Sequence, residues 1–431
     1  MTTDDDRVAE RSSVAPTQWT AVATVPRGPR ATMGRAVVAA LFRRMVRDLP
    51  VRVEFPDGSV VGAYPLSDSA SPRMLIHRPD DFFARVADGG LVGFGEAYMA
   101  GDWSAPDLAG VLTVLATRIG TAVPTPLQQL RALWLPRKPR SQRGTHAGAR
   151  ANVTHHYDLS NDFFGLFLDE TMTYSSALFD RIEGRPDWDQ LTAAQGRKIE
   201  ELLDIAGVTA GTTMLEIGTG WGELAIRAAR RGAQVRSITL SREQLLLARE
   251  RIAATGLSQQ VTAELEDYRD VRGQYDAIVS VEMIEAVGYH HLPTYLRTLD
   301  RLLRPQGRIA LQAITMPHDR MLASRDSYTW VHKYIFPGGF LPSVELLQQL
   351  TAKHTSLQIR DVRGFGQDYA DTLRLWLQRF TAHESDARAL GFDQVFGRMW
   401  RLYLAYSEAG FASGYLDVHQ FALDRAPRGH A

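Results

Sequence analysis

From residue 195 onward, short apolar runs alternate along the chain with stretches in which apolar positions recur at a helical period. Short apolar runs predict strands at 212–218, 234–240, 261–267, 277–283 and 308–314. Between them, apolar residues recur with a helical period, which predicts helices at 198–206, 223–231, 241–254 and 295–303. Strands that alternate with helices are typical of a parallel sheet covered on both faces. We therefore predict an α/β fold with a mostly parallel, doubly wound sheet.

The part of the chain before residue 150 has a different pattern and predicts a separate, smaller domain. Residues 1–30 show no periodicity and are expected to form a flexible arm. Residues 31–135 combine helical stretches at 33–49, 80–88 and 106–118 with β-like pieces at 51–55, 59–65 and 74–78, which predicts an α+β domain. Residues 136–150 hold Pro, Gly and basic residues and are typical of a linker, so the α/β domain is assigned to 151–431.

The predicted helix at 33–49 carries apolar and basic residues on different sides. Its apolar face is formed by Val37, Val38, Leu41, Phe42 and Met45, while Arg35, Arg43 and Arg47 fall elsewhere. Such a helix can lie on an anionic lipid surface, or it can pack its apolar face into a core and keep its basic side in water. We favour the core-packed interpretation, and the basic linker leaves contact with a membrane surface open.

Composition and charge exclude several classes of function. The chain has 431 residues, no cysteine, and 49 Lys and Arg against 49 Asp and Glu, so its formal net charge is zero. The lack of cysteine excludes disulfides, thiolate nucleophiles, cysteine-ligated zinc and cysteine-held iron–sulfur clusters. A balanced charge argues against nucleic acid as a partner. The acidic start and the short apolar run at 36–42 predict neither a signal peptide nor a membrane span, so we expect a cytoplasmic protein.

The sharpest chemical signal is the segment LEIGTGWGELA. A predicted strand ends there, Gly218, Gly220 and Gly222 follow, and a helix begins, so backbone N–H groups can approach a ligand closely. The G-x-G-x-G spacing, and the lack of an acidic residue at the end of the strand 234–240, argue against a dinucleotide such as NAD. Glu216, two residues before the first glycine, suits a ligand with a cationic amino group, and S-adenosylmethionine carries one.

A series of motifs resembles the cyclopropane fatty acid synthase family, which includes the mycolic acid cyclopropane synthases. The resemblance covers 152–420 and is carried by HYDLSNDFFGLFLDETMTYSSALF (156–179), LEIGTGWGELA (215–225), TLSREQ (239–244), DYRD (267–270), SVEMIEAVG (280–288), KYIFPGG (333–339) and DYADTLRLW (368–376). It implies a Rossmann-like class I methyltransferase that uses S-adenosylmethionine to methylate alkenes in phospholipid acyl chains at a membrane surface.

The whole chain most resembles the actinobacterial branch of this family. That branch makes 10-methylene fatty acids, the precursors of 10-methyl-branched, tuberculostearic-type lipids. The resemblance therefore implies an oleoyl-type substrate and a separate reductase that converts the methylene branch into a methyl branch, because this chain has no second cofactor motif. A homodimer is compatible with it, and no metal ion is implied.

The resemblance assigns roles to individual residues. Contacts with the methionine part, amino-acid end and ribose of the cofactor are implied for Tyr174, Ser175, Glu216, Gly218 and Gly220. Contacts with the ribose and adenosine are implied for Thr239, Leu240 and Gln244, and flanking of the adenine for Asp267 and Tyr268. The family also holds a bicarbonate ion in its active site, and the residues that hold it map to Ser176, Glu285, Gln312, Ile314 and Tyr369.

Two of the positions that hold the anion depart from the family pattern. Ser176 stands where many members have Cys, and Gln312 stands where they have His. Serine keeps the backbone N–H, and glutamine can donate a hydrogen bond but cannot titrate as histidine does. We therefore expect bicarbonate and Glu285 to accept the proton. Glu282, three residues before Glu285, is interpreted as a structural residue.

The implied reaction sets the requirements for the site. An isolated C=C bond is a weak nucleophile, so it has to be aligned with the sulfonium methyl. Methyl transfer leaves a carbocation that water would trap, so the pocket has to be dry, and aromatic faces can stabilise the charge. The aromatic candidates by motif position are Phe163, Phe164, Tyr334, Phe336 and Trp376, although each alone is more typical of a core residue. Loss of a proton then gives a cyclopropane ring or, after a hydride shift, a methylene branch.

Three functions stay open on the sequence alone. A lipid-alkene methyltransferase is favoured, with the methylene product preferred because of the whole-chain resemblance and the cyclopropane product as the alternative. A methyltransferase for a small molecule or protein is disfavoured by the motif KYIFPGG and by the N-terminal domain. A non-catalytic lipid-binding protein is disfavoured because the motif residues are intact. His155 and His156 are adjacent with no further ligand cluster, so they do not predict a metal site.

Overall fold

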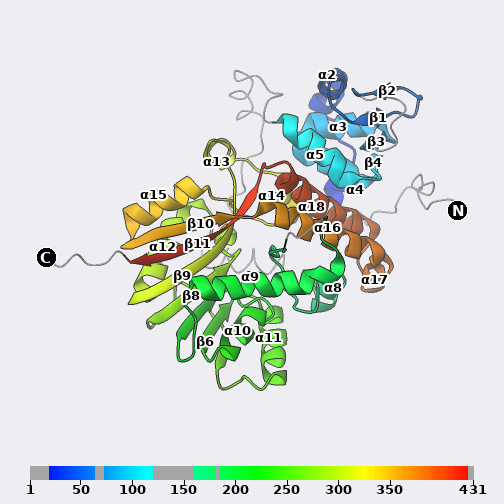
Figure 1. Ribbon diagram of the computed structural model, residues 1–431. Helices are drawn as coiled ribbons and strands as arrows, with labels where there is room; N and C mark the ends of the chain where they lie inside the picture. The colour runs from blue at the N-terminus through cyan, green and yellow to red at the C-terminus, as the bar shows by residue number, and fades with distance from the viewer. Residues whose placement is uncertain (1–18, 64–71, 120–158, 181–183, 426–431) are drawn as a thin grey trace. The chain divides into compact units, whose positions relative to one another are not determined.

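The computed structural model describes residues 19–63, 72–119, 159–180 and 184–425, and the chain divides into two compact units (Figure 1). The N-terminal unit comprises Met1–Arg137, Ser327–Ile335 and Phe380–Ser413, and the sheet unit comprises Lys138–Asp326, Phe336–Arg379 and Gly414–Ala431. Segments 327–335 and 380–413 were predicted to belong to the second domain, whereas both group with the N-terminal unit. The predicted linker, most of the predicted arm and His155–Asp158 lie outside the described residues.

The N-terminal unit is an α+β unit with a four-stranded sheet in the order β2-β1-β3-β4. Its strands are β1 (Arg52–Glu54), β2 (Val60–Val61), β3 (Arg73–Ile76) and β4 (Trp103–Ser104). Its helices are α1 (Thr20–Ala23), α2 (Pro29–Val46), α3 (Pro79–Gly89), α4 (Leu91–Ala100), α5 (Leu108–Ile119), α14 (Trp330–Tyr334), α17 (Glu384–Ala389) and α18 (Gln394–Ala412). Strands β1 and β2 pair antiparallel across a turn in which Gly58 has a φ of 80°. The predicted helices and β-like pieces of this region are thus present.

Helix α4 was not predicted, because its sequence lacks an alternation of polar and apolar positions. Most residues of LVGFGEAYMA are buried, so apolar side chains occur on nearly all sides of the helix. Its glycines permit close packing: a Cβ on Gly95 would lie 2.4 Å from the ring of Trp330. The residues of this helix are therefore suited to its tertiary packing, which cannot be predicted from a local sequence pattern.

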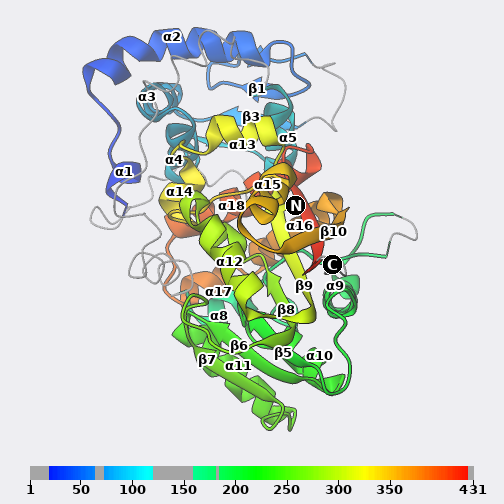
Figure 2. The same cartoon turned by 90° about the vertical axis from the view of Figure 1, so that its left-hand side faces the viewer.

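Helix α2 packs against α3 (Figure 2). Its apolar residues are divided between the core and the surface. Phe42 is buried and makes edge-on ring contacts with Phe82 and Phe83, at centroid distances of 5.4 and 5.8 Å. Val37 and Leu41 are instead 59% and 60% exposed. The core-packed interpretation is therefore confirmed for Phe42 and wrong for Val37 and Leu41, because the predicted apolar face was too wide to be buried by one neighbour.

The sheet unit contains a seven-stranded sheet in the order β10-β11-β9-β8-β5-β6-β7. Its strands are β5 (Thr213–Ile217), β6 (Gln234–Thr239), β7 (Val261–Leu265), β8 (Tyr275–Val281), β9 (Leu303–Thr315), β10 (Leu357–Gly364) and β11 (Asp417–Arg425). The five strands from β5 to β9 pair in parallel and confirm the predicted α/β sheet. Strands β10 and β11 were not predicted; they pair antiparallel with each other, and β11 with β9.

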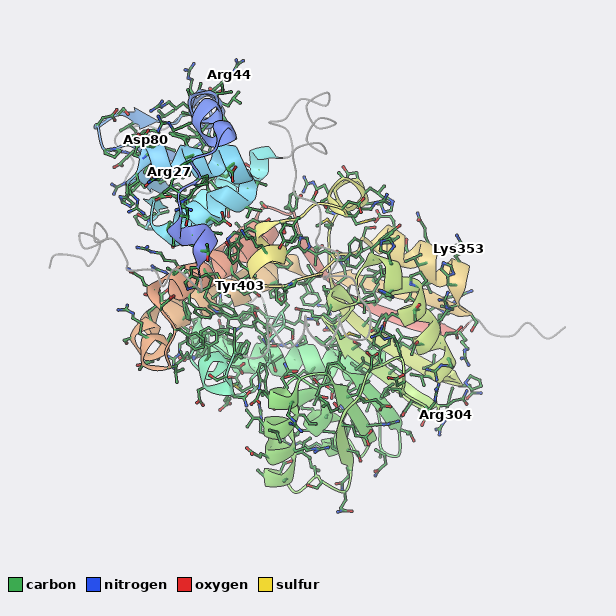
Figure 3. The ribbon with its side chains drawn as sticks, turned by 180° about the vertical axis from the view of Figure 1, so that it is seen from behind. Arg27, Arg44, Asp80, Arg304, Lys353 and Tyr403 are labelled. Carbon is green, nitrogen blue, oxygen red and sulfur yellow. The ribbon has the colours of Figure 1, made fainter. Side chains whose placement is uncertain are left out.

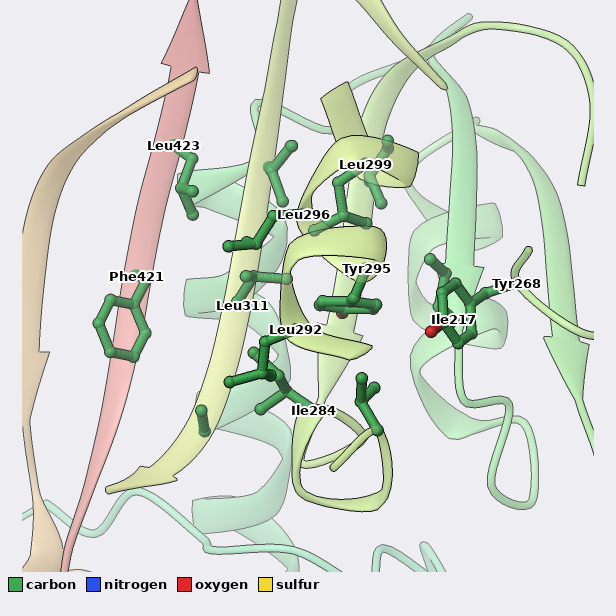
Figure 4. Packing of buried hydrophobic residues seen from close by; sticks show 14 of the residues in the cluster. Ile217, Tyr268, Ile284, Leu292, Tyr295, Leu296, Leu299, Leu311, Phe421 and Leu423 are labelled. Carbon is green, nitrogen blue, oxygen red and sulfur yellow. The ribbon is translucent and has the colours of Figure 1, made fainter. Parts of the chain in front are cut away.

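Helices cover both faces of this sheet (Figure 1). The described helices of the sheet unit are α8 (Asn161–Gly165), η3 (Trp188–Gln190), α9 (Leu191–Ile205), α10 (Glu223–Arg230), α11 (Arg242–Ala254), η4 (Ile284–Ala286), η5 (Tyr289–His291), α12 (Leu292–Leu302), α13 (His318–Ser324), α15 (Val344–His354) and most of α16 (Gly366–Ala382). One core cluster joins α12 to the sheet through residues such as Tyr295, Leu299 and Leu311 (Figure 4). A second cluster contains Leu202 of α9 and Ala225 of α10. The two cores make the carboxyl edge of the parallel strands a rigid platform.

Candidate active site

The glycine loop lies at the carboxyl end of β5, next to the strands β6 and β8. Gly218, Gly220 and Gly222 have φ values of 103°, 52° and 91°, a left-handed region in which a side chain would be strained. Helix α10 begins directly afterwards, at Glu223. Because the strand order reverses around β5, the loop lies at the topological switch point, where open α/β sheets bind their ligands.

Glu216 occupies the penultimate position of β5 and is buried below this loop. Its carboxylate accepts a hydrogen bond from the Ser237 hydroxyl, which lies 2.7 Å from Thr219 Oγ1. Burial raises the pKa of Glu216 to about 8, because a desolvated carboxyl group resists ionisation. A bound ammonium group would reverse this effect by favouring the ionised form. The position therefore suits the amino group of a methionine moiety.

A cavity opens beside the glycine loop, and every predicted cofactor residue lines it. The predicted residues in its lining are Tyr174, Ser175, Glu216, Gly218, Gly220, Thr239, Leu240, Gln244, Asp267 and Tyr268. Residues that were not predicted from the sequence also line it, among them Lys198, Trp221, Glu282 and Met283. The elements that supply them are far apart in sequence, so no local motif marks them as a set.

The end of the cavity predicted to hold the ribose and adenine is shaped by two short segments. Ser241 caps α11 by accepting a hydrogen bond from Gln244 N, and Thr239 Oγ1 donates to Gln244 Oε1 at 3.2 Å. Asp267 accepts two hydrogen bonds from the guanidinium of Arg269, at 2.8 and 2.6 Å. Burial raises the pKa of Tyr268 to about 12, so its hydroxyl stays protonated. These contacts hold polar groups in place for a nucleoside.

The residues predicted to hold bicarbonate surround two glutamates. Glu282 accepts hydrogen bonds from Ser176 N at 2.9 Å and Gln312 Nε2 at 2.8 Å, both on Oε1, and from the Tyr369 hydroxyl at 2.6 Å on Oε2. Ile314 N donates to Glu285 Oε1 at 2.5 Å. The structure thus brings together all the predicted positions. It also places Glu282, interpreted from the sequence as structural, at their centre.

Bicarbonate does not fit this arrangement. Three of the groups that would hold it, from Ser176, Gln312 and Tyr369, already donate to the Glu282 carboxylate. A second anion at the same position would have to displace that side chain and would meet its negative charge. Repulsion between like charges is strong in a buried site. The resemblance implies the ion, but the residues present fill its place with a carboxylate of the protein.

The two glutamates differ in how well each can carry a negative charge. Burial raises the pKa of both, and the charge of Glu282 adds to the effect on Glu285, whose pKa reaches about 8. The three hydrogen bonds to Glu282 oppose this rise, whereas Glu285 accepts one from the Ile314 backbone, and its Oε2 has no partner among the described residues. Glu282 is therefore the member of the pair that ionises first.

Lys198 lies close to this pair and was missed from the sequence. Its ammonium is buried and donates to Ser175 Oγ at 2.6 Å. Burial lowers the pKa of Lys198 to about 8, while the charges of Glu282 and Asp169 oppose that shift. Because Lys198 lies mid-helix in α9, with no motif around it, sequence reasoning had no signal for this role.

Aromatic side chains form a cluster next to the cavity. Tyr174, which lines the cavity, contacts the rings of Phe164 at 5.2 Å and Trp376 at 5.4 Å between centroids. Phe163 stacks edge-on against Phe164 and is fully buried. Tyr334 belongs instead to the N-terminal unit, where its hydroxyl donates to Glu96 at 2.7 Å. The predicted cation-stabilising set is therefore split between the two units.

Within the described residues there is no group of three or more His, Asp or Glu side chains arranged to hold a metal ion. The cavity chemistry is supplied by the glycine loop, the buried carboxylates and the aromatic cluster. The cavity has a polar end for a nucleoside and a buried acid for an ammonium group, which suit a sulfonium methyl donor. A proton acceptor lies nearby, which suits a substrate that loses a proton after it is methylated.

Comparison with known proteins agrees with this geometry. The model of the mycolic acid cyclopropane synthetase family matches residues 145–421. The chain is 54% identical over 410 residues to tuberculostearic acid methyltransferase UfaA1 of Mycobacterium tuberculosis, covering 95% of each chain. It is 33% identical over 376 residues to cyclopropane-fatty-acyl-phospholipid synthase of Escherichia coli K12, covering 84% of this chain and 90% of that one.

A solved structure extends the comparison to the cofactor. The mycolic acid cyclopropane synthase CmaA1, complexed with SAH and CTAB, has a TM-score of 0.58 and 31% identity, and covers 67% of this chain and 99% of its own. SAH is the product that S-adenosylmethionine leaves after methyl transfer. The glycine-loop cavity and these matches together place the chain in the mycolic acid cyclopropane synthetase family, as a methyltransferase that uses S-adenosylmethionine.

Proposed function

We propose that the protein transfers a methyl group from S-adenosylmethionine to the double bond of an oleoyl-type phospholipid acyl chain and releases a 10-methylene-branched chain. One observation carries the proposal. Glu282 lines the cavity that suits the methyl donor, and its carboxylate is also the acceptor at the centre of a cluster of hydrogen-bond donors. A proton acceptor beside a methyl donor is what alkylation of an unactivated alkene requires, because the cation formed has to lose a proton.

The residues divide the work of this reaction. Glu216 pairs with the ammonium of the methionine moiety, and the glycine loop lets the backbone approach the cofactor. The alkene electron pair attacks the sulfonium methyl, the C–S bond breaks, and the acyl chain carries the positive charge. Tyr174 and its aromatic neighbours stabilise that charge and exclude water. A carboxylate of the Glu282 and Glu285 pair then removes the proton.

The name of the 54% identical relative, a tuberculostearic acid methyltransferase, supports the methylene product over the cyclopropane. Both products form from one methylated cation, and in both the new methyl group loses a proton. They differ in whether a hydride shifts before that proton leaves. The cyclopropane product is the second candidate, because the relative from E. coli is a cyclopropane-fatty-acyl-phospholipid synthase. Conversion of the methylene to a methyl branch would need a separate reductase, and dimerisation stays a prediction.

The test of the function uses the purified full-length protein, S-adenosylmethionine and vesicles of dioleoyl phosphatidylglycerol. We expect a methylated acyl chain whose new carbon is lost on ozonolysis, because ozone cleaves the C=C bond of a methylene branch. A cyclopropane product has the same mass but resists ozone, so that outcome would favour the second candidate. No product, with cofactor binding retained in calorimetry, would overturn the proposal in favour of a non-catalytic lipid-binding protein. Reactions without the cofactor serve as the control.

We further propose that helix α2 places the enzyme on an anionic membrane surface. None of the described helices combines the length and the apolar character needed to cross a bilayer. Val37 and Leu41 are more than half exposed on α2, and Arg44 lies on the outer side of the same helix (Figure 3). Apolar residues beside arginines favour the interface of a bilayer, at about 1 kcal/mol for each basic residue near an anionic surface.

Co-sedimentation with vesicles tests this surface. We expect binding to vesicles that contain phosphatidylglycerol, loss of binding in high salt, and weaker binding of Leu41→Asp. The matched control is Leu322→Asp in the sheet unit, which changes another exposed leucine (46% against 60% exposed) outside α2. Binding that ignores lipid charge and is equal for both variants would contradict the role of α2.

A further inference from the structure

We propose that Glu282 is the general base of the reaction, and that its side chain replaces the bicarbonate ion which related enzymes bind. The inference rests on the proposed function, since it assigns the proton acceptor of that reaction. It makes the anion part of the chain, so the enzyme works without dissolved bicarbonate. Glu285 then becomes a positioning residue, which supports the base without removing the proton itself.

The hydrogen bonds to Glu282 are those that an anion would need. A backbone N–H, a side-chain amide and a phenol converge on its two oxygens at 2.6 to 2.9 Å. A carboxylate and a bicarbonate both present a planar pair of oxygens that shares one negative charge, so one can take the place of the other. Glu282 also lines the cofactor cavity, which brings the base to the compartment of the methyl donor.

The backbone at Glu282 indicates that this placement is specific. Its φ of 48° lies in the left-handed region, and among the described residues Met172 is the other non-glycine residue there. A glycine would adopt this conformation without strain, whereas a side chain costs about 1 kcal/mol or more. The strain is maintained because the carboxylate gains its three hydrogen bonds. Strain of this kind clusters at functional sites.

Gln312 is held so that its donor faces Glu282. Its Oε1 accepts a hydrogen bond from Gln420 Nε2 at 3.2 Å, and the two residues are register partners on β9 and β11. The amide nitrogen is therefore left to donate to Glu282. A glutamine cannot titrate, so it cannot compete with Glu282 for the proton. This explains why glutamine suits a site whose anion is a side chain.

Local charges agree with a single ionised carboxylate. The buried ammonium of Lys198 lies near Glu282 and balances one negative charge. Glu285 has fewer hydrogen bonds and stays protonated while Glu282 is ionised. A bound bicarbonate would add a further negative charge to this buried group. Burial raises the pKa of Glu282 above the ordinary value, which makes its carboxylate a stronger base.

The proposed step balances with these groups alone. A hydride first shifts with its electron pair from the methylated carbon to the neighbouring cationic carbon, which moves the positive charge to the methylated carbon. A C–H bond of the new methyl group then breaks, and its electron pair forms the C=C bond of the methylene branch. The proton forms an O–H bond with Glu282, which becomes a neutral carboxylic acid. After product release the proton returns to solvent. No oxidant, reductant or free anion enters the step.

The first experiment removes bicarbonate from the wild-type protein. Buffers are purged of carbon dioxide, and product formation is measured with S-adenosylmethionine and dioleoyl phosphatidylglycerol before and after bicarbonate is restored. We expect the two rates to agree within a factor of two. Loss of activity in purged buffer and recovery with bicarbonate would overturn the proposal. Absence of product under both conditions would instead count against the proposed function, so the two failures are distinguishable.

The second experiment changes the base. Glu282→Gln keeps the shape but removes the charge, and we expect at least about a 100-fold loss of turnover, the lower range for a general base. Glu282→Gly suits the local φ and removes the carboxylate to which Ser176, Gln312 and Tyr369 donate, so that a small anion can take its place. We expect Glu282→Gly to be inactive in purged buffer and to regain activity with added formate or bicarbonate.

Controls separate a catalytic effect from a folding effect. Cofactor binding by calorimetry should be retained in both Glu282 variants, and Glu250→Gln removes a carboxylate from the exposed face of α11 without an expected loss of activity. Wild-type turnover by Glu282→Gln, or by Glu282→Gly in purged buffer, would show that Glu282 is not the base. If a variant fails to bind the cofactor, the wild-type bicarbonate experiment still decides the question.

Discussion

The glycine loop and the Glu282 cluster lie at the same edge of the sheet, but they are assembled from the chain in different ways. The loop is one continuous stretch that joins β5 to α10. The cluster joins four separate segments, since Ser176, Gln312 and Tyr369 meet a residue that follows β8. The loop acts mainly through backbone groups, and the cluster acts mainly through side chains and one backbone N–H.

The glycine loop and the Glu282 cluster therefore tolerate amino-acid substitution differently. A backbone site keeps its function as long as its glycines keep their conformation, so its chemistry is shared by methyltransferases with many substrates. A cluster of side chains can exchange one anion for another when a single residue gains a carboxylate, as at Glu282. The glycine loop is therefore typical of the fold class, and the Glu282 cluster determines how the reaction ends.

The largest effect on cofactor affinity is expected for Glu216→Gln. The variant keeps a partner for Ser237 but loses the charge that pairs with the cofactor ammonium. A hydrogen bond to a charged group contributes about 1.5–3 kcal/mol, so we expect the Kd for S-adenosylmethionine to rise about 10- to 100-fold. Calorimetry measures this. Turnover at saturating cofactor should fall far less, because the Glu282 cluster is unchanged.

The control for this prediction is Glu282→Gln, which removes a charge from the other region. It should affect turnover and leave the cofactor Kd within about threefold, a shift under 1 kcal/mol. A Kd that stays unchanged in Glu216→Gln would show that the buried acid does not contact the ammonium. Equal changes in Kd and turnover in both variants would show that the two regions do not act separately.

A smaller effect is expected for Tyr369→Phe. The variant removes the hydroxyl that donates to Glu282 at 2.6 Å and keeps the ring, which packs edge-on against Trp376. Glu282 then retains two donors, so we expect turnover to fall about tenfold, the value of one charged hydrogen bond at the lower end of its range. Cofactor affinity should not change. Turnover equal to that of the wild type would remove Tyr369 from the support of the base.

The local character of the glycine loop explains why it could be predicted from sequence. Its glycines, the strand before it and the helix after it are adjacent in the chain, and Ser241 likewise caps α11 within four residues. Each of these features follows from short-range rules on backbone conformation and helix ends. Strands β5 to β9 were predictable for the same reason, because each is a compact apolar run.

The role of Glu282 could not be predicted, because it depends on contacts between residues far apart in the chain. Glu282 and Glu285 both follow β8 and have the same chemistry, and the sequence gives no φ for either. The donors to Glu282 lie 106, 30 and 87 residues away. One signal was present: glutamine replaces a titratable residue at position 312, which is unexpected next to a bound anion that has to accept a proton.

Strand β10, helix α4 and the unit to which two segments belong were also not predicted, because they too depend on tertiary packing. Strand β10 has mostly exposed residues, so it lacks a continuous apolar run, and helix α4 is buried on too many sides to show a period. The segments 327–335 and 380–413 group with the N-terminal unit through tertiary packing, for example of α18 against α4 and α5. Linear order along the chain does not report such packing.

The smallest effect concerns protons released when the cofactor binds. Burial raises the pKa of Glu216 to about 8, so at pH 7 most of the free enzyme holds this carboxyl group protonated. A bound ammonium favours the ionised form, so binding should expel up to one proton, and affinity should increase with pH until about 8. Calorimetry in buffers of different ionisation enthalpy measures the release.

The pH dependence that follows from the raised pKa of Glu216 also distinguishes the glycine loop from the Glu282 cluster. A raised pKa stabilises the free protein at low pH, and that contribution is lost as pH rises from about 4.3, the ordinary value for Glu, through about 8. Cofactor binding restores stability in that window because it pairs the newly ionised Glu216. Glu216→Gln should abolish the proton release, whereas Glu285→Gln should retain it, although the pKa of Glu285 is also near 8. Release that persists in Glu216→Gln would assign the proton to the carboxylate pair and join the two regions electrostatically.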